Sequence, residues 1–386
     1  MLQAEIAIII DEPVEQMRNN SYSSVQNLYY RILLQTSFAY GVRAAIFCLY
    51  DCKKKEDGSL YGRGLFWSAD GFVLAESVVP RIVENRIIMP FQKLQQHYAS
   101  FSQWLEGCTI LNGYTEYVDK LSLPKILIAS GLGAYSIPTY RVDSFEDIRQ
   151  GMQRFHRCIV KPARGNKGIG LSYIEERDGA LYYSNTQSAG ILTAEVWDKI
   201  CREAVFHKYI LQPCLDFHNA NGSALDFRLL VSRGKDGAWE AAVIHARVGG
   251  SRFVANGSSG GAVTLAEEVL LREFGSSADQ LMHELIFLST AVPNALDRFN
   301  NRLVSCYGID AAIDRETMLP YIIEVNLGPG VDYTPWQLAE RRARYYRHLL
   351  NRPVEESGAY RPITGSLIYS SKHSADEQKS SAPLHP

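Results

Sequence analysis

The chain has 386 residues, of which 46% are hydrophobic and 21% charged, and its formal net charge is −2. This length suffices for two or three domains with a sizeable buried core. Because positive and negative charges nearly balance, the composition gives no support for nucleic acid or an anionic membrane as the main partner.

The cysteines and the N-terminus point to a cytoplasmic protein. The seven cysteines are odd in number and lack Cys-x-x-Cys spacing, so the sequence indicates neither a disulfide framework nor a zinc site. A reducing cytosol is the expected location. The chain begins with the apolar stretch 6–10 and shows no signal-peptide pattern, and no apolar run is long enough to cross a bilayer. We therefore expect no membrane partner.

The first segment, residues 1–115, alternates apolar stretches with helical patterns. Strands are predicted at residues 4–10, 43–49 and 72–78, and helices at residues 24–40 and 91–105. Such alternation is typical of a small α/β domain built on a mostly parallel sheet.

The second segment, residues 116–207, contains a strand, a glycine-rich loop and another strand. Lys161 ends the first strand, and the loop contains Gly165, Lys167, Gly168 and Gly170. Glycines let backbone N–H groups approach a phosphate closely, and a lysine adds a positive charge. The loop is not a Walker A loop, because the next element has the pattern of a strand. A plain tight turn with a surface lysine is the alternative.

The third segment, residues 208–350, begins with an apolar stretch that contains Pro213. Proline has no backbone N–H to donate to a neighbouring strand, so strand pairing is interrupted there. The interruption leaves backbone groups free. The carbonyl of Pro213 and the N–H of Leu215 can pair with an adenine edge, with Asp216 near the ribose. A buried edge strand with a kink is the alternative interpretation.

A hairpin is predicted around residues 235–237. Both registers that its turn allows place four polar residues on one sheet face, namely Asp226, Arg228, His245 and Arg247. Two arginines beside the glycine- and serine-rich stretch 249–261 can clamp phosphoryl oxygens or a developing oxyanion. The alternative is a solvated face whose arginines pair with Asp226 and Glu240.

A second hairpin is predicted from the apolar runs 308–313 and 321–325. If its turn centres near Thr317, Asp310 lies opposite Glu324. Alternation along the strand puts Glu324 and Asn326 on one face and Ile323 and Val325 on the other.

Two carboxylates that face each other across a strand pair repel and weaken the sheet. A bound cation removes this penalty. An all-oxygen set of Asp310, Glu324 and Asn326 suits Mg²⁺ or Mn²⁺ rather than zinc. A solvated hairpin face with ordinary charges is the alternative. After this hairpin and a helix, residues 351–386 are poor in apolar residues, and we expect a disordered tail.

The order of these features resembles the ATP-grasp superfamily over roughly residues 117–332. In chain order they are Lys120, the loop after Lys161, Gln212, Arg228, Arg247, Asn256, Asp310, Glu324 and Asn326. Asp226-Phe227-Arg228 resembles the Asp-x-Arg of RimK-like ligases. Residues 83–87, 245–249 and 254–256 are most similar to the YheC/YheD group, which is named for endospore coat-associated proteins.

The resemblance implies an ATP-grasp fold of the α/β plus α+β class. An N-terminal α/β domain would precede two α+β subdomains, residues 116–207 and 208–350, that sandwich ATP. Lys120 and Lys161 would hold the α- and β-phosphates under the loop 165–170. The resemblance assigns the other nucleotide contacts to Gln212, Pro213, Leu215, Asp216 and Asn256.

The implied reaction is ATP-dependent ligation of a carboxylate to an amine through an acyl phosphate, on a small-molecule or peptide substrate. One or two Mg²⁺ would lie on Asp310, Glu324 and Asn326, while Arg228 and Arg247 would stabilise the transferring group and the tetrahedral intermediate. The alternative is a non-catalytic ATP-binding protein of spore coat structure or assembly. A phosphotransferase would need a base, for which His245 is the candidate.

Overall fold

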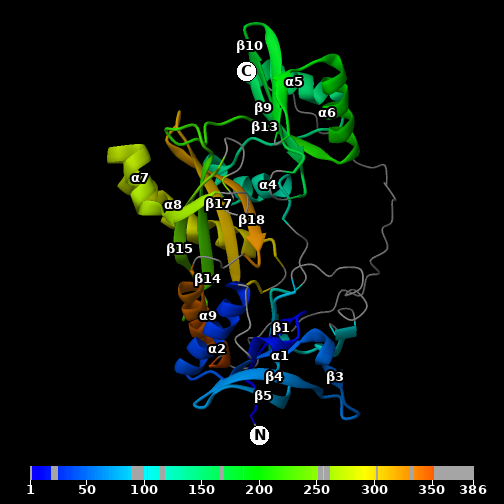
Figure 1. Cartoon of the computed structure of the whole chain (residues 1–386), viewed down its shortest axis with the longest axis vertical. Helices are drawn as coiled ribbons and strands as arrows, with labels where there is room; N and C mark the ends of the chain where they lie inside the picture. Colours follow the sequence, from blue (N-terminus) through cyan, green and yellow to red (C-terminus); the bar gives the residue numbers. More distant parts are fainter. Residues whose placement is uncertain are drawn as a thin grey trace.

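The computed structural model describes most of the chain. The described residues are 2–18, 25–87, 100–101, 103–113, 118–165, 169–185, 187–250, 255, 261–300, 303–329 and 334–351. They form three sheets that follow one another along the long axis of the molecule (Figure 1). The expected tail, residues 351–386, lies outside the described residues beyond Asn351.

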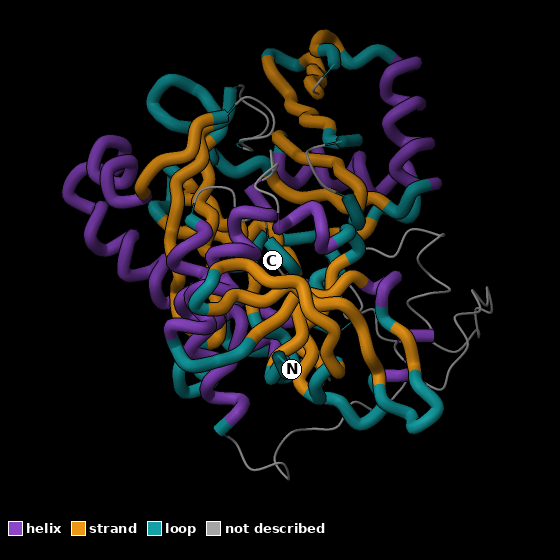
Figure 2. Tube along the Cα trace, turned by 60° about the horizontal axis from the view of Figure 1, so that its bottom comes forward, coloured by secondary structure: helices purple, strands orange, loops and turns teal. Residues whose placement is uncertain are grey.

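The N-terminal sheet has the strand order β3-β4-β2-β1-β6-β7, with β5 paired to β4. Its strands are β1 (Ile6–Ile10), β2 (Ala44–Cys48), β3 (Lys53–Lys54), β4 (Leu60–Ser68), β5 (Gly71–Val78), β6 (Ile82–Asn85) and β7 (Thr109–Leu111). Figure 2, in which the bottom of Figure 1 comes forward, shows these strands crossing the front of the molecule.

The expectation of a mostly parallel sheet is wrong, because only three of the six strand pairs are parallel. β1 pairs in parallel with β2 and β6, and β6 with β7, whereas the pairs of β4 with β2, β3 and β5 are antiparallel. The reason is the short turn between β4 and β5, since parallel neighbours need a long crossover. Every residue of β1 is buried, with helices α1 (Val14–Arg18) and α2 (Val25–Ala39) nearby in sequence.

The central sheet is antiparallel throughout, with the order β12-β11-β10-β9-β13-β8. Its strands are β8 (Tyr140–Arg141), β9 (Arg157–Pro162), β10 (Ser172–Arg177), β11 (Ala180–Asn185), β12 (Ala189–Ile191) and β13 (Tyr209–Pro213). Because β13 lies between β9 and β8, the edge-strand interpretation is wrong. Pro213 fits there because it lies beyond the two residues of β13 that pair with β8.

Helices α5 (Phe145–Phe155) and α6 (Ala194–Phe206) cover one face of the central sheet. Ser144 begins α5 with a capping box in which Asp147 takes part. Gly151 lets α5 approach β13 closely, because a Cβ there would lie 2.5 Å from Leu211 Cδ1. The opposite face of the sheet therefore remains for the side chains of Lys161 and Gln212.

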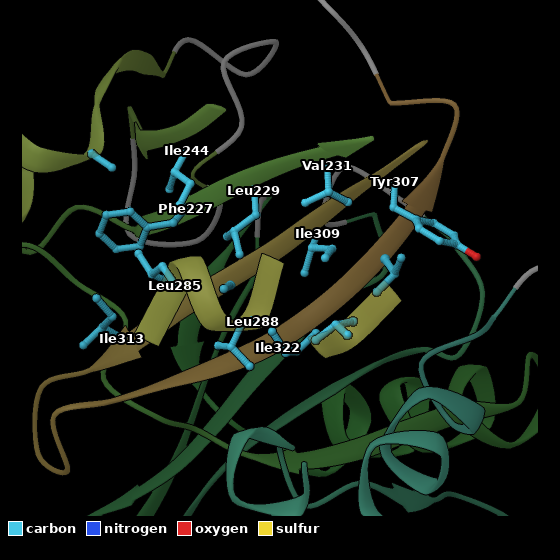
Figure 3. Close-up of a cluster of buried hydrophobic side chains, with 14 of the residues drawn as sticks. Phe227, Leu229, Val231, Ile244, Leu285, Leu288, Tyr307, Ile309, Ile313 and Ile322 are labelled. Atoms are coloured by element: carbon cyan, nitrogen blue, oxygen red, sulfur yellow. The ribbon is translucent and has the colours of Figure 1, made fainter. Parts of the chain in front are cut away.

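The third sheet is also antiparallel and has the order β16-β15-β14-β17-β18. Its strands are β14 (Leu225–Arg233), β15 (Trp239–Val248), β16 (Ala262–Leu265), β17 (Cys306–Asp314) and β18 (Leu319–Leu327). Helices α7 (Ala266–Phe274) and α8 (Ala278–Asp297) cover one face. Figure 3 shows alternate residues of the strands, such as Phe227 and Ile309, packed with Leu285 and Leu288 of α8. Their neighbours in sequence point to the other face.

Helix α9 (Pro335–Leu350) joins the third sheet to the N-terminal one. It packs beside α2 (Figure 1). Buried Arg342 of α9 contacts Glu84 of β6 and donates to Cys306 Sγ at the start of β17, with a distance of 3.1 Å. Asn112 and Ser305 exchange two hydrogen bonds of 2.8 Å. These contacts fix the first residues of β17. The remaining elements are α4 (Ser122–Ala129) and the 3-10 turns Leu49–Asp51, Gly133–Tyr135 and Gly275–Ser277.

The predicted pairing of Asp310 with Glu324 is confirmed. A register shift follows between Asp310 and Ala311, because Ala311 pairs with Ile322 and leaves Ile323 as an extra residue. The prediction that Ile323 shares the apolar face with Val325 stays a prediction, because Ile323 has no paired residue on β17. Ile322 packs in the core with Val325, because the bulge changes the alternation of faces at that point.

Within the described part of the chain, no helix has both the length and the apolar character needed to cross a membrane. β13, residues 209–213, belongs to the central sheet although it follows residue 207. The division into domains at residues 115, 207 and 350 stays a prediction.

Candidate functional site

Four polar side chains lie in one row across the third sheet. His245 of β15 pairs with Arg228 of β14, Arg228 pairs with Asp310 of β17, and Asp310 pairs with Glu324 of β18. Directly paired residues share a sheet face, so all four lie opposite the face that α8 covers. Arg247 pairs with Asp226, two residues along each strand from the pair of His245 and Arg228. Both arginines therefore share one face, as predicted.

Asp310 is the centre of the row. Its side chain is 6% exposed and accepts from Nε of Arg228 at one oxygen and from Nη2, at 3.1 Å, at the other. Arg247 Nη2 lies 3.1 Å from Oδ2 of Asp310. Burial disfavours the ionised carboxyl, but the two arginines together keep the pKa of Asp310 below its ordinary value. Asp310 is therefore a carboxylate at neutral pH.

Gly308, next to Asp310 on the same face, keeps space for Arg228. A Cβ at this position would lie 2.7 Å from Pro329 Cβ and 3.0 Å from Arg228 Nη1. Any larger residue would displace the guanidinium from Asp310 or move the chain at Pro329. Sequence reasoning missed this role, because the contact joins β17, β14 and the segment that follows β18.

The oxygens of Glu324 and Asp310 converge on Asn326. The Asn326 amide nitrogen lies 3.1 Å from Oε1 of Glu324 and 3.4 Å from Oδ2 of Asp310. Lys120 Nζ lies 3.5 Å from Oε2 of Glu324. The Lys120 ammonium thus contacts one of the two carboxylates, and the Asn326 amide contacts both. The three predicted metal-ligand residues are brought together by the fold.

These residues match the chemistry of a hard divalent cation. An amide rotated by a half turn would present its oxygen to the same point as the two carboxylates, giving an all-oxygen set. No group of three or more histidine, cysteine, aspartate or glutamate residues that could hold a metal occurs among the described residues. The third protein ligand of a cation at this point would thus be Asn326.

Asp226 and Arg247 form a two-nitrogen ion pair beside the row. Nε and Nη2 of Arg247 lie 2.5 and 2.7 Å from the oxygens of Asp226. Burial raises the pKa of Asp226 to about 6, although Arg247 opposes the shift. The alternative of a solvated face correctly predicted that an arginine pairs with Asp226. It was wrong about exposure, because both side chains of this pair are mostly buried, and about Glu240, whose ion pair, at 3.7 Å, is with Arg341.

Lys161 and Lys120 bring positive charge from the central segment. Lys161 of β9 is buried, and burial together with the nearby charge of Lys120 lowers its pKa to about 8, while Glu324 opposes the shift. Lys120 Nζ also donates to the carbonyl of Gly165 at 2.7 Å, which ties it to the glycine-rich loop. Both lysines therefore lie between the central sheet and the carboxylates of β17 and β18.

The glycine-rich loop lies between β9 and β10 in the sequence, and these two strands pair antiparallel. The sequence predicted this order of strand, loop and strand. Gly165 and Gly170 have positive φ values of 141° and 75°. A Cβ at Gly170 would lie 2.6 Å from Tyr209 Oη, so this position needs glycine. Lys167, Gly168 and Asn256 lie outside the described residues.

Residues that follow β13 border a cavity near Gln212, the residue before the last of that strand. Gln212 is buried and donates to Thr139 Oγ1 at 2.8 Å, while its Oε1 has no hydrogen-bond partner among the described atoms. The adjoining cavity of about 250 Å³ is lined by Leu215, Asp216 and residues of β9, β10 and β11. The cavity at the predicted hinge is thus lined by both polar and apolar side chains.

The hinge is held by the β17–β18 turn, which sequence reasoning did not connect with it. The backbone N–H of Asp216 donates to Asp314 Oδ1 at 2.8 Å, and the N–H of Arg315 donates to the carbonyl of Asp216 at 3.1 Å. The Asp216 side chain accepts from His218 at 2.8 Å. No local pattern marks contacts between positions about a hundred residues apart.

Comparison with known proteins places the chain in a family. The model of the YheC/D-like ATP-grasp family matches residues 107–353. The chain belongs to this family. Two relatives come from Bacillus subtilis (strain 168). Endospore coat-associated protein YheC is 23% identical over 267 residues, 66% of this YheC/D-like chain and 72% of the relative. Endospore coat-associated protein YheD is 23% identical over 184 residues, 46% of this chain and 40% of the relative.

Solved structures show the fold of this YheC/D-like protein. A RiPP-associated ATP-grasp ligase from Chryseobacterium gregarium, in complex with ADP and a leader and core peptide, has a TM-score of 0.50 at 10% identity, covering 90% of this chain and 97% of that chain. The ATP-grasp ligase PsnB, complexed with minimal precursor, has a TM-score of 0.52 at 11% identity, covering 90% and 99%. The fold is ATP-grasp, as the resemblance implied.

Proposed function

We propose that this protein is an ATP-dependent ligase that joins a carboxylate to an amine through an acyl phosphate. The observation that carries the proposal is the row of Arg228, Asp310 and Glu324, with Asn326 between the two carboxylates. Such a row sets cation ligands beside a guanidinium, which is the arrangement that phosphoryl transfer requires.

Asp310, Glu324 and Asn326 would hold one or two divalent cations, Mg²⁺ or Mn²⁺. When bound, the cation neutralises phosphate charge during transfer. The fit rests on the converging oxygens and on Lys120, whose ammonium already lies against Glu324.

Lys120, Lys161 and the loop containing Gly165 and Gly170 would hold the phosphates of ATP. Lys167, Gly168 and Asn256 complete this proposed set. At the other end of the nucleotide, the backbone of Pro213 and Leu215 would pair with the base edge, close to Gln212, whose buried Oε1 has no hydrogen-bond partner among the described atoms. Asp216 would contact the ribose.

The two arginines act on the transferring group. A carboxylate oxygen of the acceptor attacks the γ-phosphorus, and the bond to the oxygen of ADP breaks. The amine then attacks the acyl carbon, loses a proton and expels inorganic phosphate. Arg228 and Arg247 would stabilise the charge on the phosphoryl oxygens and on the tetrahedral oxyanion. No side chain has to form a covalent bond.

A non-catalytic ATP-binding role in the spore coat is the second candidate. Its support is the name of the two relatives, both of which are called endospore coat-associated. In favour of activity, the described part of the site keeps both arginines and both carboxylates. We therefore retain the ligase as the leading proposal, with a small molecule or a peptide as substrate.

ADP release by purified protein with Mg²⁺ and ATP tests the proposal. Pooled amino acids and short peptides serve as acceptors, because one solved neighbour was in complex with a leader and core peptide and the other with a minimal precursor. We expect at least one pool to stimulate ADP release and to yield a product heavier than the acceptor by mass spectrometry. If ATP binds but no pool stimulates release, the coat-associated, non-catalytic role is favoured.

The pKa of Lys161 makes nucleotide affinity depend on pH. Phosphate favours the protonated lysine, which is already present below pH 8, so affinity should be constant there. Above pH 8 a proton must be taken up on binding, and affinity should fall by up to about tenfold per pH unit. Isothermal titration of MgADP at pH 7, 8 and 9 measures this. The Lys161→Arg variant, which stays charged, should lack the extra fall, and parallel curves for the two proteins would contradict the assignment.

A further inference from the structure

The two arginines of the site are held in different ways. Both hydrogen bonds that the structure shows for the Arg228 guanidinium end on Asp310. Arg247 contacts Asp310 through Nη2 at 3.1 Å but also places Nε and Nη2 on Asp226. Arg247 therefore has a second carboxylate that lies outside the proposed cation site.

The pair of Asp226 and Arg247 is rigid for two reasons. The residues are direct cross-strand partners in β14 and β15, so the strand register sets their distance. Their side chains are only 14% and 11% exposed, and water competes poorly for a buried two-nitrogen pair. Breaking such a pair leaves a charge without its partner in a poorly hydrated place.

Asp310 cannot coordinate a cation and also keep all its present contacts with the two arginines. Oδ2 already lies within 3.1 Å of Arg228 Nη2 and of Arg247 Nη2. A ligand at this oxygen displaces or weakens these contacts. Arg228 then keeps only its Nε contact to Oδ1 of the same carboxylate, whereas Arg247 keeps both contacts to Asp226.

We propose that Asp226 is the positioning residue of Arg247: it holds that guanidinium in place whether or not Asp310 is engaged, whereas Arg228 moves with Asp310. The inference rests on the proposed function. It gives the two arginines different roles. Arg247 is a preorganised hydrogen-bond donor to the transferring phosphoryl group, whereas Arg228 becomes free to contact that group only when a cation occupies Asp310. Asp226 itself touches no substrate in this scheme.

Binding of MgADP with and without aluminium fluoride tests the inference without a known acceptor. Aluminium fluoride beside ADP mimics the transferring phosphoryl group, so Arg247 should matter for that complex and not for MgADP alone. The Asp226→Asn variant keeps the shape of the side chain and removes its charge. We expect MgADP affinity within about twofold of wild type and a loss of about tenfold or more for the fluoride complex, since small displacements of a catalytic group are costly.

Asp297→Asn is the matched control. Asp297 at the end of α8 forms a partly buried ion pair with Nη2 of Arg233, a β14 residue away from the site, at 2.7 Å. This variant should change neither affinity. Equal weakening of MgADP and of the fluoride complex in Asp226→Asn, or no weakening of either, would overturn the inference.

Nitrogen-15 NMR of the arginine Nε–H groups separates failure of the inference from failure of the proposed function. Arg228→Lys and Arg247→Lys assign the two signals. In the nucleotide-free protein, the protected Nε–H signal of Arg247 should be lost or broadened in Asp226→Asn, while that of Arg228 persists. An unchanged Arg247 signal refutes the inference even if MgADP does not bind, whereas absent MgADP binding by the wild type refutes only the proposed function.

Discussion

Replacing Glu324 by alanine should reduce Mg²⁺-dependent ADP release by about a hundredfold or more, the scale on which electrostatic groups of active sites act. The variant removes one of the two carboxylates that converge on Asn326. Mn²⁺ binding, followed by electron paramagnetic resonance, should weaken in parallel. Both measurements report on the cation rather than on the acceptor.

Stability should move differently from activity in this variant. Asp310 and Glu324 face each other in the strand pair, so removing one carboxylate relieves their repulsion, but it also takes away the partner of the Lys120 ammonium at 3.5 Å. We therefore expect the thermal unfolding midpoint of the metal-free protein to change little. Glu316→Ala is the control, because Glu316 lies in the turn of the same hairpin with a side chain that is 68% exposed. Wild-type turnover with normal Mn²⁺ binding in Glu324→Ala would refute the cation site.

The Arg228→Ala variant should lower kcat by about 10²–10³ and leave the affinity for MgATP within a fewfold of wild type. The reason is that Arg228 acts on the charge that develops during transfer. Asp310 keeps Arg247 at 3.1 Å, so the variant does not leave that buried carboxylate alone. Single-turnover ADP formation and equilibrium binding measure the two quantities separately.

Arg228→Lys is the companion to this variant. Lysine restores one positive charge but not the two-nitrogen contact with Asp310, so turnover should lie between those of wild type and alanine. Turnover equal to wild type in Arg228→Ala, or ATP affinity that falls as steeply as kcat, would mean that Arg228 has another role.

The site face of the third sheet could be read from the sequence because strand alternation is a local property. Asp226 and Arg228 are two residues apart, as are His245 and Arg247, and each pair shares a face by geometry. The hairpin partner of Asp310 followed from the short distance between two apolar runs. The family followed in the same way, from the order of these motifs along the chain.

Other features needed the tertiary structure. The bulge that brings Ile322 to the core beside Val325 depends on packing against α8, because an extra strand residue is accommodated where the core requires it. The position of β13 between β9 and β8 depends on long-range pairing. Periodicity cannot choose between possible partners.

By itself, the sequence determined which side chains share a strand face and in what order the motifs occur, because both depend on near neighbours. Only the tertiary structure decided how these side chains are paired. The contact of Lys120 with Glu324, the second partner of Arg247 and the burial that lowers the pKa of Lys161 all join or surround distant segments. Such contacts are set by how the sheets pack, and charge and burial at the site follow from that packing.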